Sequence, residues 1–156
     1  MPTIVLAGSL LSTALMAGVY FGFSTSVMPG LARTDARTYV SAMRQIDRAI
    51  ENPRFLSLFL GALVLPVIAA FLHGGGNRLT WIISGGLLYG ATVIITAAAN
   101  VPLNRALHAA GVVDDRSASA ARSAHHTRWS RFNTARAVLC TAAAISLAVA
   151  ISQPVS

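Results

Sequence analysis

The chain has 156 residues and a formal net charge of +7, yet 54% of its residues are hydrophobic and only 11% are charged. The charges are confined to a few stretches, which leaves runs of about 20 apolar residues, the length that crosses a bilayer as a helix. This composition excludes an ordinary soluble domain and predicts one integral membrane domain over residues 1–156, with the lipid bilayer as its first partner. Because no nucleic-acid-binding motif accompanies the arginines, we expect no nucleic-acid partner.

Four apolar runs follow one another along the chain. They predict transmembrane helices over residues 3–28, 55–72, 79–99 and 134–152. The first is expected to end at Met28-Pro29-Gly30, because proline and glycine interrupt helices. At these lengths only helices satisfy the backbone polar groups in lipid. The fold class is therefore all-α, an integral membrane four-helix bundle.

The arginines predict how the bundle is oriented. Five lie in the first loop, residues 29–54, five in the third, residues 100–133, and only Arg78 lies in the second. Basic residues concentrate in the cytoplasmic loops of membrane proteins. We therefore expect loops one and three in the cytoplasm, both termini outside, and a place in the plasma (inner) membrane.

The first loop contains an amphipathic helix, which is expected to end before Pro53. Between residues 36 and 50 the residues at helical spacing on one face are apolar except for Asp47, and the opposite face carries Arg, Ser and Glu. The helix has two interpretations. It is an interfacial helix on the bundle end or in the headgroups, or it is a lid over a pocket.

Two pairs of glycines recur at four-residue spacing, Gly18 with Gly22 and Gly86 with Gly90. Such pairs allow membrane helices to approach closely. Tight packing within the bundle explains them, and a contact in a homo-oligomer is the alternative.

The stretch from Arg116 to Cys140 is expected to form one helix, or nearly one, that extends the fourth span into the third loop. At 100° per residue, one arc of this helix mixes imidazole, indole, amide and guanidinium groups. Its members are Arg122, His125, His126, Trp129, Asn133, Arg136 and Cys140. Polar groups at membrane depth are costly, so they usually face the bundle interior or a cavity.

Arg136 is the costliest of these groups, because it lies past the start of the apolar run. One interpretation is that it snorkels to the interface or pairs with an acid such as Asp47 or Glu51. The other is that it binds an anion or an oxyanion.

Two further polar clusters are expected at the same end of the bundle. The first, on the third span and its continuation at four-residue spacing, comprises Thr92, Thr96, Asn100, Asn104 and His108. The second, at the end of the first span, comprises Tyr20, Phe23 and Ser24.

The sequence lacks HExxH, CxxC, a phosphate-binding glycine loop and GxSxG. His125 and His126 are adjacent and diverge on a helix, whereas a helical histidine pair that binds a metal prefers i and i+4 spacing. Haem needs only one or two axial histidines. The residues alone therefore leave haem or a metal open.

Four groups of residues give the chain a family resemblance. They are Gly18–Ser24 with Met28-Pro29; Ala42–Asp47 followed by Asn52–Phe55; Thr96 with Asn100–Asn104; and Trp129–Asn133 with Arg136. In this order, and spread over nearly the whole chain, they resemble the DUF1772 or anthrone-oxygenase-like membrane proteins. The Asn-Val-Pro-Leu-Asn run with the downstream Trp, Asn and Arg is the most specific part.

The resemblance implies a four-helix membrane bundle that oxygenates an anthrone, a reduced tricyclic aromatic, to an anthraquinone during polyketide metabolism. The family is described as needing neither metal nor flavin, so no cofactor is expected. An anthrone loses a proton to give an electron-rich carbanion, which itself can pass an electron to oxygen. The protein would then be a cofactor-independent monooxygenase for a lipophilic aromatic or quinol-like small molecule.

Residue chemistry suggests a role for each candidate in such a reaction. The general base is His126 or His108, the hydrogen bonds to the enolate come from Asn100, Asn104 and Asn133, and Arg136 stabilises negative charge. Stacking is assigned to Trp129, and the other substrate contacts are assigned to Tyr20, Phe23, Ser24 and His125.

Two other classes of function stay open. One is a haem- or metal-bearing redox protein with His108, His125 or His126 as ligands. The other is a non-catalytic membrane protein, either a small transporter or a partner-binding subunit. A transporter places ionisable groups near mid-bilayer with links to both faces. Here the polar groups gather at one face, which weighs against transport.

Overall fold

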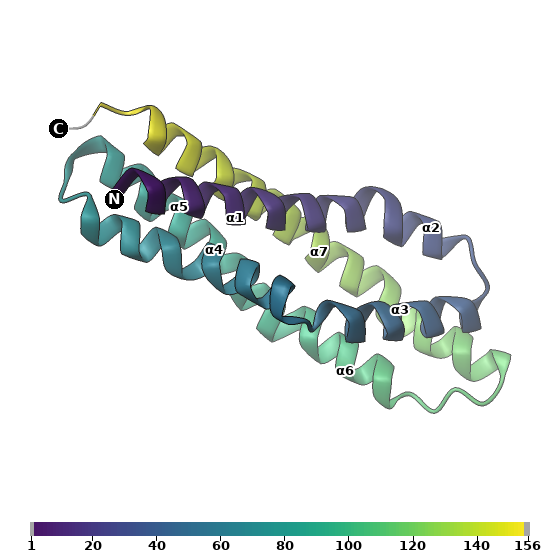
Figure 1. Ribbon diagram of the computed structural model, residues 1–156. Helices are drawn as coiled ribbons and strands as arrows, with labels where there is room; N and C mark the ends of the chain where they lie inside the picture. The colour runs from purple at the N-terminus through teal and green to yellow at the C-terminus, as the bar shows by residue number, and fades with distance from the viewer. Residues whose placement is uncertain (1, 155–156) are drawn as a thin grey trace.

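The computed structural model describes residues 2–154, which form helices and short connections with no strand among them. Two of the elements, η1 and η2, are π-helical turns. The order is α1 (Pro2–Gly22), η1 (Phe23–Val27), α2 (Met28–Ala32), α3 (Ala36–Ile50), α4 (Pro53–Leu72), α5 (Gly76–Ile95), η2 (Thr96–Asn100), α6 (Val101–Ala109) and α7 (Asp115–Ser152). The start of α1, the end of α7 and the α4–α5 connection lie at one end of the molecule (Figure 1).

Four helical columns are long and apolar enough to cross a membrane. They are Pro2–Ala32, Pro53–Leu72, Gly76–Ala109 and Asp115–Ser152. Their outer faces carry large exposed apolar side chains, including Ile4, Phe71 and Leu87. Water would disfavour such an apolar surface, whereas lipid matches it. The all-α membrane bundle predicted from the sequence is confirmed.

The columns extend past the ends of the apolar runs. Met28-Pro29-Gly30 does not end the first column, which continues to Ala32, and the third column passes Pro102 to reach Ala109. The helix α7 measures about 57 Å at 1.5 Å per residue, against a hydrocarbon core of about 30 Å. The end of the bundle that carries α2, α6 and the start of α7 therefore projects beyond the membrane.

Both helices continue through proline because a widened turn precedes it. The N–H of Met28 donates to the carbonyl of Phe23, and the N–H of Val101 donates to the carbonyl of Thr96, five residues back in each case. Proline removes one N–H group and crowds the carbonyl of the preceding turn. A π-helical turn relieves that crowding, and such turns are frequent at functional sites.

The amphipathic helix α3 packs on the projecting end of the bundle (Figure 1). Its apolar face buries Tyr39, Val40 and Met43 against Leu107 of α6 and Trp129 of α7. Its C-terminal turn lines a cavity that is described below. The two interpretations of this helix are thus combined, because α3 lies on the bundle end and also covers a pocket.

The closest glycine contact is not one that the sequence spacing predicts. A Cβ atom built on Gly85 of α5 would lie 2.8 Å from the Cγ atom of Leu147 in α7, so this pair of helices needs the glycine. A Cβ atom on Gly18, Gly22 or Gly90 would meet nothing within 4 Å. Packing within the chain therefore does not explain these three glycines, and the expectation of tight packing there is wrong.

Two arginines of the predicted cytoplasmic loops bind helix ends. The guanidinium of Arg122 donates to the carbonyls of Ala32 at 2.5 Å and Thr34 at 2.8 Å, and that of Arg44 donates to the carbonyl of Leu107. The last carbonyls of a helix lack intrahelical partners and carry a partial negative charge. Arg122 therefore joins α7 to the end of α2, and Arg44 joins α3 to the end of α6.

Candidate functional site

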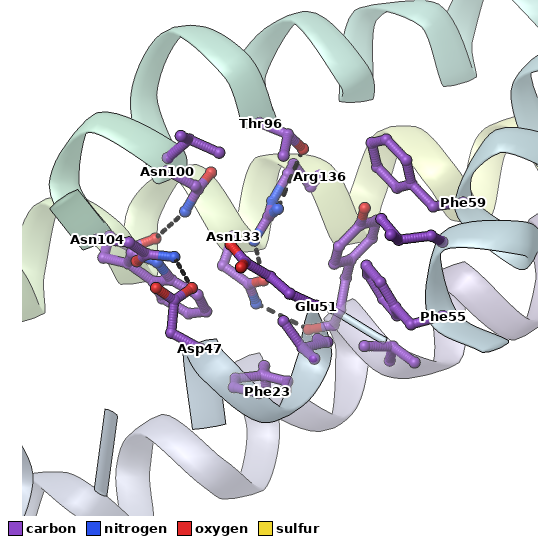
Figure 2. Close-up of a pocket in the computed structure, with 16 residues that line it drawn as sticks. Phe23, Asp47, Glu51, Phe55, Phe59, Thr96, Asn100, Asn104, Asn133 and Arg136 are labelled. Carbon is purple, nitrogen blue, oxygen red and sulfur yellow. Dashed lines mark hydrogen bonds between the residues drawn. The ribbon is translucent and has the colours of Figure 1, made fainter. Parts of the chain in front are cut away.

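A cavity of about 230 Å³ lies where α3 meets the membrane-spanning part of the bundle. Its walls come from α1, η1, α3, α4, η2, α6 and α7 (Figure 2). The lining residues are Val19, Tyr20, Phe23, Asp47, Ile50, Glu51, Phe55, Leu56, Phe59, Thr96, Asn100, Val101, Asn104, Trp129, Asn133 and Arg136.

One wall of the cavity is apolar and largely aromatic. Phe55 and Phe59 on successive turns of α4 are stacked, with ring centroids 6.0 Å apart, and Phe23 of η1 packs against Trp129. Leu56 belongs to the same wall and is 44% exposed on the outer surface of the bundle. The apolar wall thus reaches the surface that lipid covers.

The opposite wall holds a buried positive charge. The guanidinium of Arg136, which is 6% exposed, donates to the Thr96 hydroxyl at 3.1 Å and to the Asn133 side-chain oxygen at 2.9 Å. It also lies 4.4 Å from the centre of the Tyr20 ring and 5.6 Å from that of Trp129. Neither snorkelling nor pairing with an acid describes it, since the side chain is buried and no ion pair of residues 2–154 includes it.

Asn133 connects this arginine to the first helix. Its amide nitrogen donates to the carbonyl of Tyr20 and to the hydroxyl of Ser24, both at 2.8 Å. Its side-chain oxygen accepts from Arg136. Both amide hydrogens and the oxygen of Asn133 therefore already have protein partners, so this side chain orients its neighbours.

Four buried polar atoms at the cavity have no hydrogen-bond partner in the described part of the chain. They are Tyr20 Oη, Asn100 Oδ1, Trp129 Nε1 and Arg136 Nε. Buried polar atoms almost always have a partner, so a group of unpaired ones requires an explanation. Donors and acceptors that converge on an otherwise apolar cavity are the usual pattern of a small-molecule site.

A carboxylate enters the same cavity from α3. Asp47 Oδ1 accepts a hydrogen bond from the amide of Asn104, and Asp47 Oδ2 lies 2.9 Å from Nε2 of His108 (Figure 2 shows the first of these contacts). Asn104 and His108 lie one turn apart on α6. An outward-facing groove begins on the far side of this carboxylate, with His108 in its wall.

Behind Asn104 the hydrogen bonds run in one direction. Because the Asn104 amide nitrogen donates to Asp47, its oxygen faces His125 Nε2 at 3.4 Å and accepts from it. His125 Nδ1 then accepts from the Tyr39 hydroxyl at 2.8 Å. Burial raises the pKa of Tyr39, so its hydroxyl keeps the proton that it donates. In this series of hydrogen bonds, each donor therefore points toward the Asp47 carboxylate.

Comparison with known families bears on what such a cavity does. A family model described as anthrone oxygenase matches residues 54–146, more than half of the chain. The chain belongs to the anthrone oxygenase family. No match was found among curated proteins or among solved structures.

The match covers the part of this anthrone oxygenase family member that supplies the α4 wall and the polar wall from Thr96 to Arg136. Tyr20 and Asp47 lie before the matched residues. The family match does not cover these two residues, and the structure places both at the cavity.

The cavity brings together most of the side chains that the sequence singled out. Those that line it are Tyr20, Phe23, Asn100, Asn104, Trp129, Asn133 and Arg136. Those that do not line it are Ser24, His108, His125 and His126. Ser24 and His125 contact lining residues from behind, whereas His126 packs against the Tyr39 ring with centroids 5.6 Å apart.

Sequence reasoning named Asp47 and Glu51 only as possible ion-pair partners of Arg136, and it did not single out the aromatic α4 wall. Asp47 gave the one usable signal, because it is the single polar residue on the apolar face of α3. Glu51 gave none, since it belongs to the polar face of that helix. Phe55 and Phe59 fall within the predicted span 55–72, where apolar residues are expected in any case.

The donor groups around the cavity bear on metal binding. Among the described residues, no three His, Cys, Asp or Glu side chains gather in a group that could hold a metal ion. His108 and His125 lie on opposite sides of the Asp47–Asn104 pair, and each uses one ring nitrogen to bond it. The expectation that this family member needs no cofactor stays a prediction.

Proposed function

We propose that this protein is a membrane oxygenase for a flat, lipophilic aromatic ketone of the anthrone type, which it converts to the quinone with molecular oxygen. The observation that carries the proposal is the group of four unpaired polar atoms on residues that line the cavity, one of them on the buried Arg136, in a cavity that also has an aromatic wall. The ketone oxygen of such a substrate becomes an enolate oxygen, which accepts hydrogen bonds from the donors of the cavity. The flat rings of the substrate pack against the aromatic wall. Membership of the anthrone oxygenase family supports the same reaction.

The reaction begins with loss of a proton from the substrate methylene group. The negative charge that develops moves to the ketone oxygen, where the guanidinium of Arg136 and the indole N–H of Trp129 stabilise it. Preorganised donors in a site that excludes water contribute more than the same donors in water. Asn100 Oδ1 then accepts a hydrogen bond from a further hydroxyl group on the rings, and Tyr20 Oη donates to or accepts from another.

Oxygen reacts with the electron-rich enolate. One electron passes to oxygen and the resulting pair of radicals forms a carbon–oxygen bond, which gives a hydroperoxide after protonation. Loss of the second methylene proton and cleavage of the oxygen–oxygen bond then release water and leave a carbonyl. The methylene carbon is oxidised and oxygen is reduced, so the substrate supplies all the electrons and we propose that no cofactor is needed.

The membrane supplies the substrate in this proposal. An apolar tricyclic ketone partitions into lipid, and the α4 wall with its exposed Leu56 adjoins that phase. We further propose that the projecting end with α2, α3 and α6 is cytoplasmic and that the protein lies in the plasma membrane, because ten of the twelve arginines occupy the loops at that end.

The first experiment measures oxygen uptake and quinone absorbance after anthrone is added to the purified protein in lipid nanodiscs. We expect uptake well above that of protein-free nanodiscs, with one oxygen molecule consumed per quinone formed. Arg136→Met should lower the rate by about 100- to 1,000-fold, because it removes a donor to the oxyanion. The matched control is Arg131→Met, which replaces an exposed arginine of the same helix and should leave the rate unchanged.

Two results would contradict the proposal. The first is uptake no faster than that of protein-free nanodiscs, which would leave a non-catalytic membrane protein. The second is a visible haem band or stoichiometric metal whose removal abolishes uptake, which would favour the redox-protein alternative.

A further inference from the structure

Asp47 lies at the boundary between two spaces. It lines the cavity and also an outward-facing groove of about 540 Å³, together with Glu51. The other residues that line the groove are Arg48, Arg105, His108 and Ala109. Asp47 and Glu51 are thus the two carboxylates that can reach the cavity, and they lie one turn apart at the C-terminal end of α3.

The two carboxylates differ in how firmly they are held. Asp47 has an 18% exposed side chain, and both of its oxygens contact α6 side chains, Asn104 and His108. Glu51 is exposed at the C-cap of α3, and its side chain makes no hydrogen bond with the described residues. A catalytic base must be held within reach of the proton that it abstracts, so the geometry favours Asp47.

The histidines predicted as bases fit this role less well. His126 does not line the cavity, and His108 lies on the groove side of Asp47. His125 is behind Asn104, with each ring nitrogen engaged. Each of these rings is therefore separated from the cavity by another side chain.

We infer that Asp47 is the acid–base group of the oxygenation, an inference that rests on the proposed function. Asp47 takes one methylene proton to form the enolate and returns it to the peroxide anion that forms with oxygen. It then takes the second methylene proton as the oxygen–oxygen bond breaks and returns it to the leaving hydroxide, which departs as water. Two protons leave carbon and two arrive on oxygen, so one carboxylate serves the whole cycle.

Asn104 and His108 are positioning residues in this scheme. Their two bonds fix the Asp47 carboxylate from α6, while the Tyr39–His125 pair orients Asn104 from the buried side. The amide of Asn104 takes up no proton. Its contribution is to keep the carboxylate turned toward the cavity.

Proton transfer to Asp47 can be measured apart from the oxygen chemistry. Without oxygen the first step is reversible, so the wild-type protein in nanodiscs should exchange the methylene hydrogens of anthrone for deuterium from deuterated buffer. Mass spectrometry follows the exchange, with protein-free nanodiscs as the blank. Asp47→Asn should lower both the anaerobic exchange and the aerobic oxygen uptake by about 100-fold or more, because the amide cannot accept a proton.

Two variants separate Asp47 from its neighbours. Glu51→Gln removes the competing carboxylate and should keep most of the exchange. His108→Gln should lower kcat several-fold with little change in KM, because the substrate site is intact while the base is less well oriented. His73→Gln is the matched control, since His73 lies at the opposite end of the bundle and should leave both constants unchanged.

Binding of anthraquinone checks that the Asp47→Asn site is folded, and its affinity should equal that of the wild type. If Asp47→Asn then exchanges hydrogens or takes up oxygen at the wild-type rate, the assignment is overturned while the proposed function stands. Loss of exchange in Glu51→Gln alone would move the base to that residue. A wild-type protein that takes up no oxygen would instead overturn the proposed function.

Discussion

Asn133 shows how a single side chain can hold several neighbours of a buried cavity in place. It joins α7 to α1 through the Tyr20 carbonyl and the Ser24 hydroxyl, and it orients the Arg136 guanidinium. All of these groups lie where water is scarce, so each bond counts for more than it would at an aqueous surface. The amide thus supports the helix packing and the direction of the positive charge together.

We expect Asn133→Ala to lower the free energy of unfolding by about 1–3 kcal/mol, because buried partners lose their hydrogen bonds. Unfolding in mixed micelles, followed by circular dichroism, measures the change. Ser123→Ala replaces an exposed serine on the same helix and should leave stability unchanged. Equal stability of the two variants would contradict the connecting role of Asn133.

The sequence predicted contacts within the candidate site only along a single helix, and for residues on other elements it predicted only that they lie at the same end of the bundle. Trp129, Asn133 and Arg136 share an arc of α7, so their spacing alone places them side by side. Asp47 could not be matched to Asn104 and His108 in advance, because no local pattern says which turn of α3 meets which turn of α6. His126 was misplaced for a related reason, since one residue of rotation separates it from the buried His125.

At the scale of the element, α3 carries Asp47 and begins at a side-chain cap. It follows a short connection from α2, and the Asp35 carboxylate accepts from the Thr38 hydroxyl at 2.6 Å and from the Thr38 backbone N–H at 2.9 Å. These bonds satisfy a donor that the first turn would otherwise leave free. Asp47 lies three turns further along α3, so its position depends on where the cap makes the helix begin.

The hydrogen bonds from the Thr38 hydroxyl and backbone hold the pKa of Asp35 below its ordinary value of 3.8. Because the folded pKa is the lower one, the stabilisation of α3 is present above pH 3.8 and is lost as the pH falls through the folded value. We expect hydrogen-exchange protection of the α3 amides to fall over that range. In Asp35→Asn, which keeps a capping side chain that does not titrate, the fall should be much smaller. The same pH dependence in both proteins would contradict the cap.

At the scale of the whole molecule, the bundle is divided into a lipid-covered part and a projecting polar part. The apolar runs were sufficient to predict four membrane helices, because the bilayer imposes their length and composition. The length of the helices beyond the membrane was not predictable from hydropathy. It depends on two prolines being accommodated in widened turns and on polar helices being held by arginines that bind carbonyls, and neither leaves an apolar pattern.

The proposed orientation predicts which end chemical reagents can reach. The single native cysteine, Cys140, is buried, so maleimide labelling of a cysteine introduced at an exposed position has little background from Cys140. Asn77→Cys in the first turn of α5 should react with a membrane-impermeant maleimide from outside intact cells, and Ser119→Cys near the start of α7 should react only in inverted vesicles. The reverse pattern would invert the orientation, and the wild-type protein is the unlabelled control.

The two π-helical turns have a consequence for how the chain can change during evolution. Each turn holds one residue more than an α-helical turn would, so deleting one residue from Thr96–Asn100 would convert it to an ordinary α-helical turn and leave the helix after it in nearly the same register. The change would fall on the turn itself, where Pro102 would crowd the preceding carbonyl and the cavity-lining side chains of Thr96 and Asn100 would move. Relatives with the same cavity should therefore conserve the length of these two segments more strictly than the identity of Ala97, Ala98 and Ala99 in the second. In an alignment of relatives, a one-residue gap in either segment would identify proteins in which the cavity lining is arranged differently.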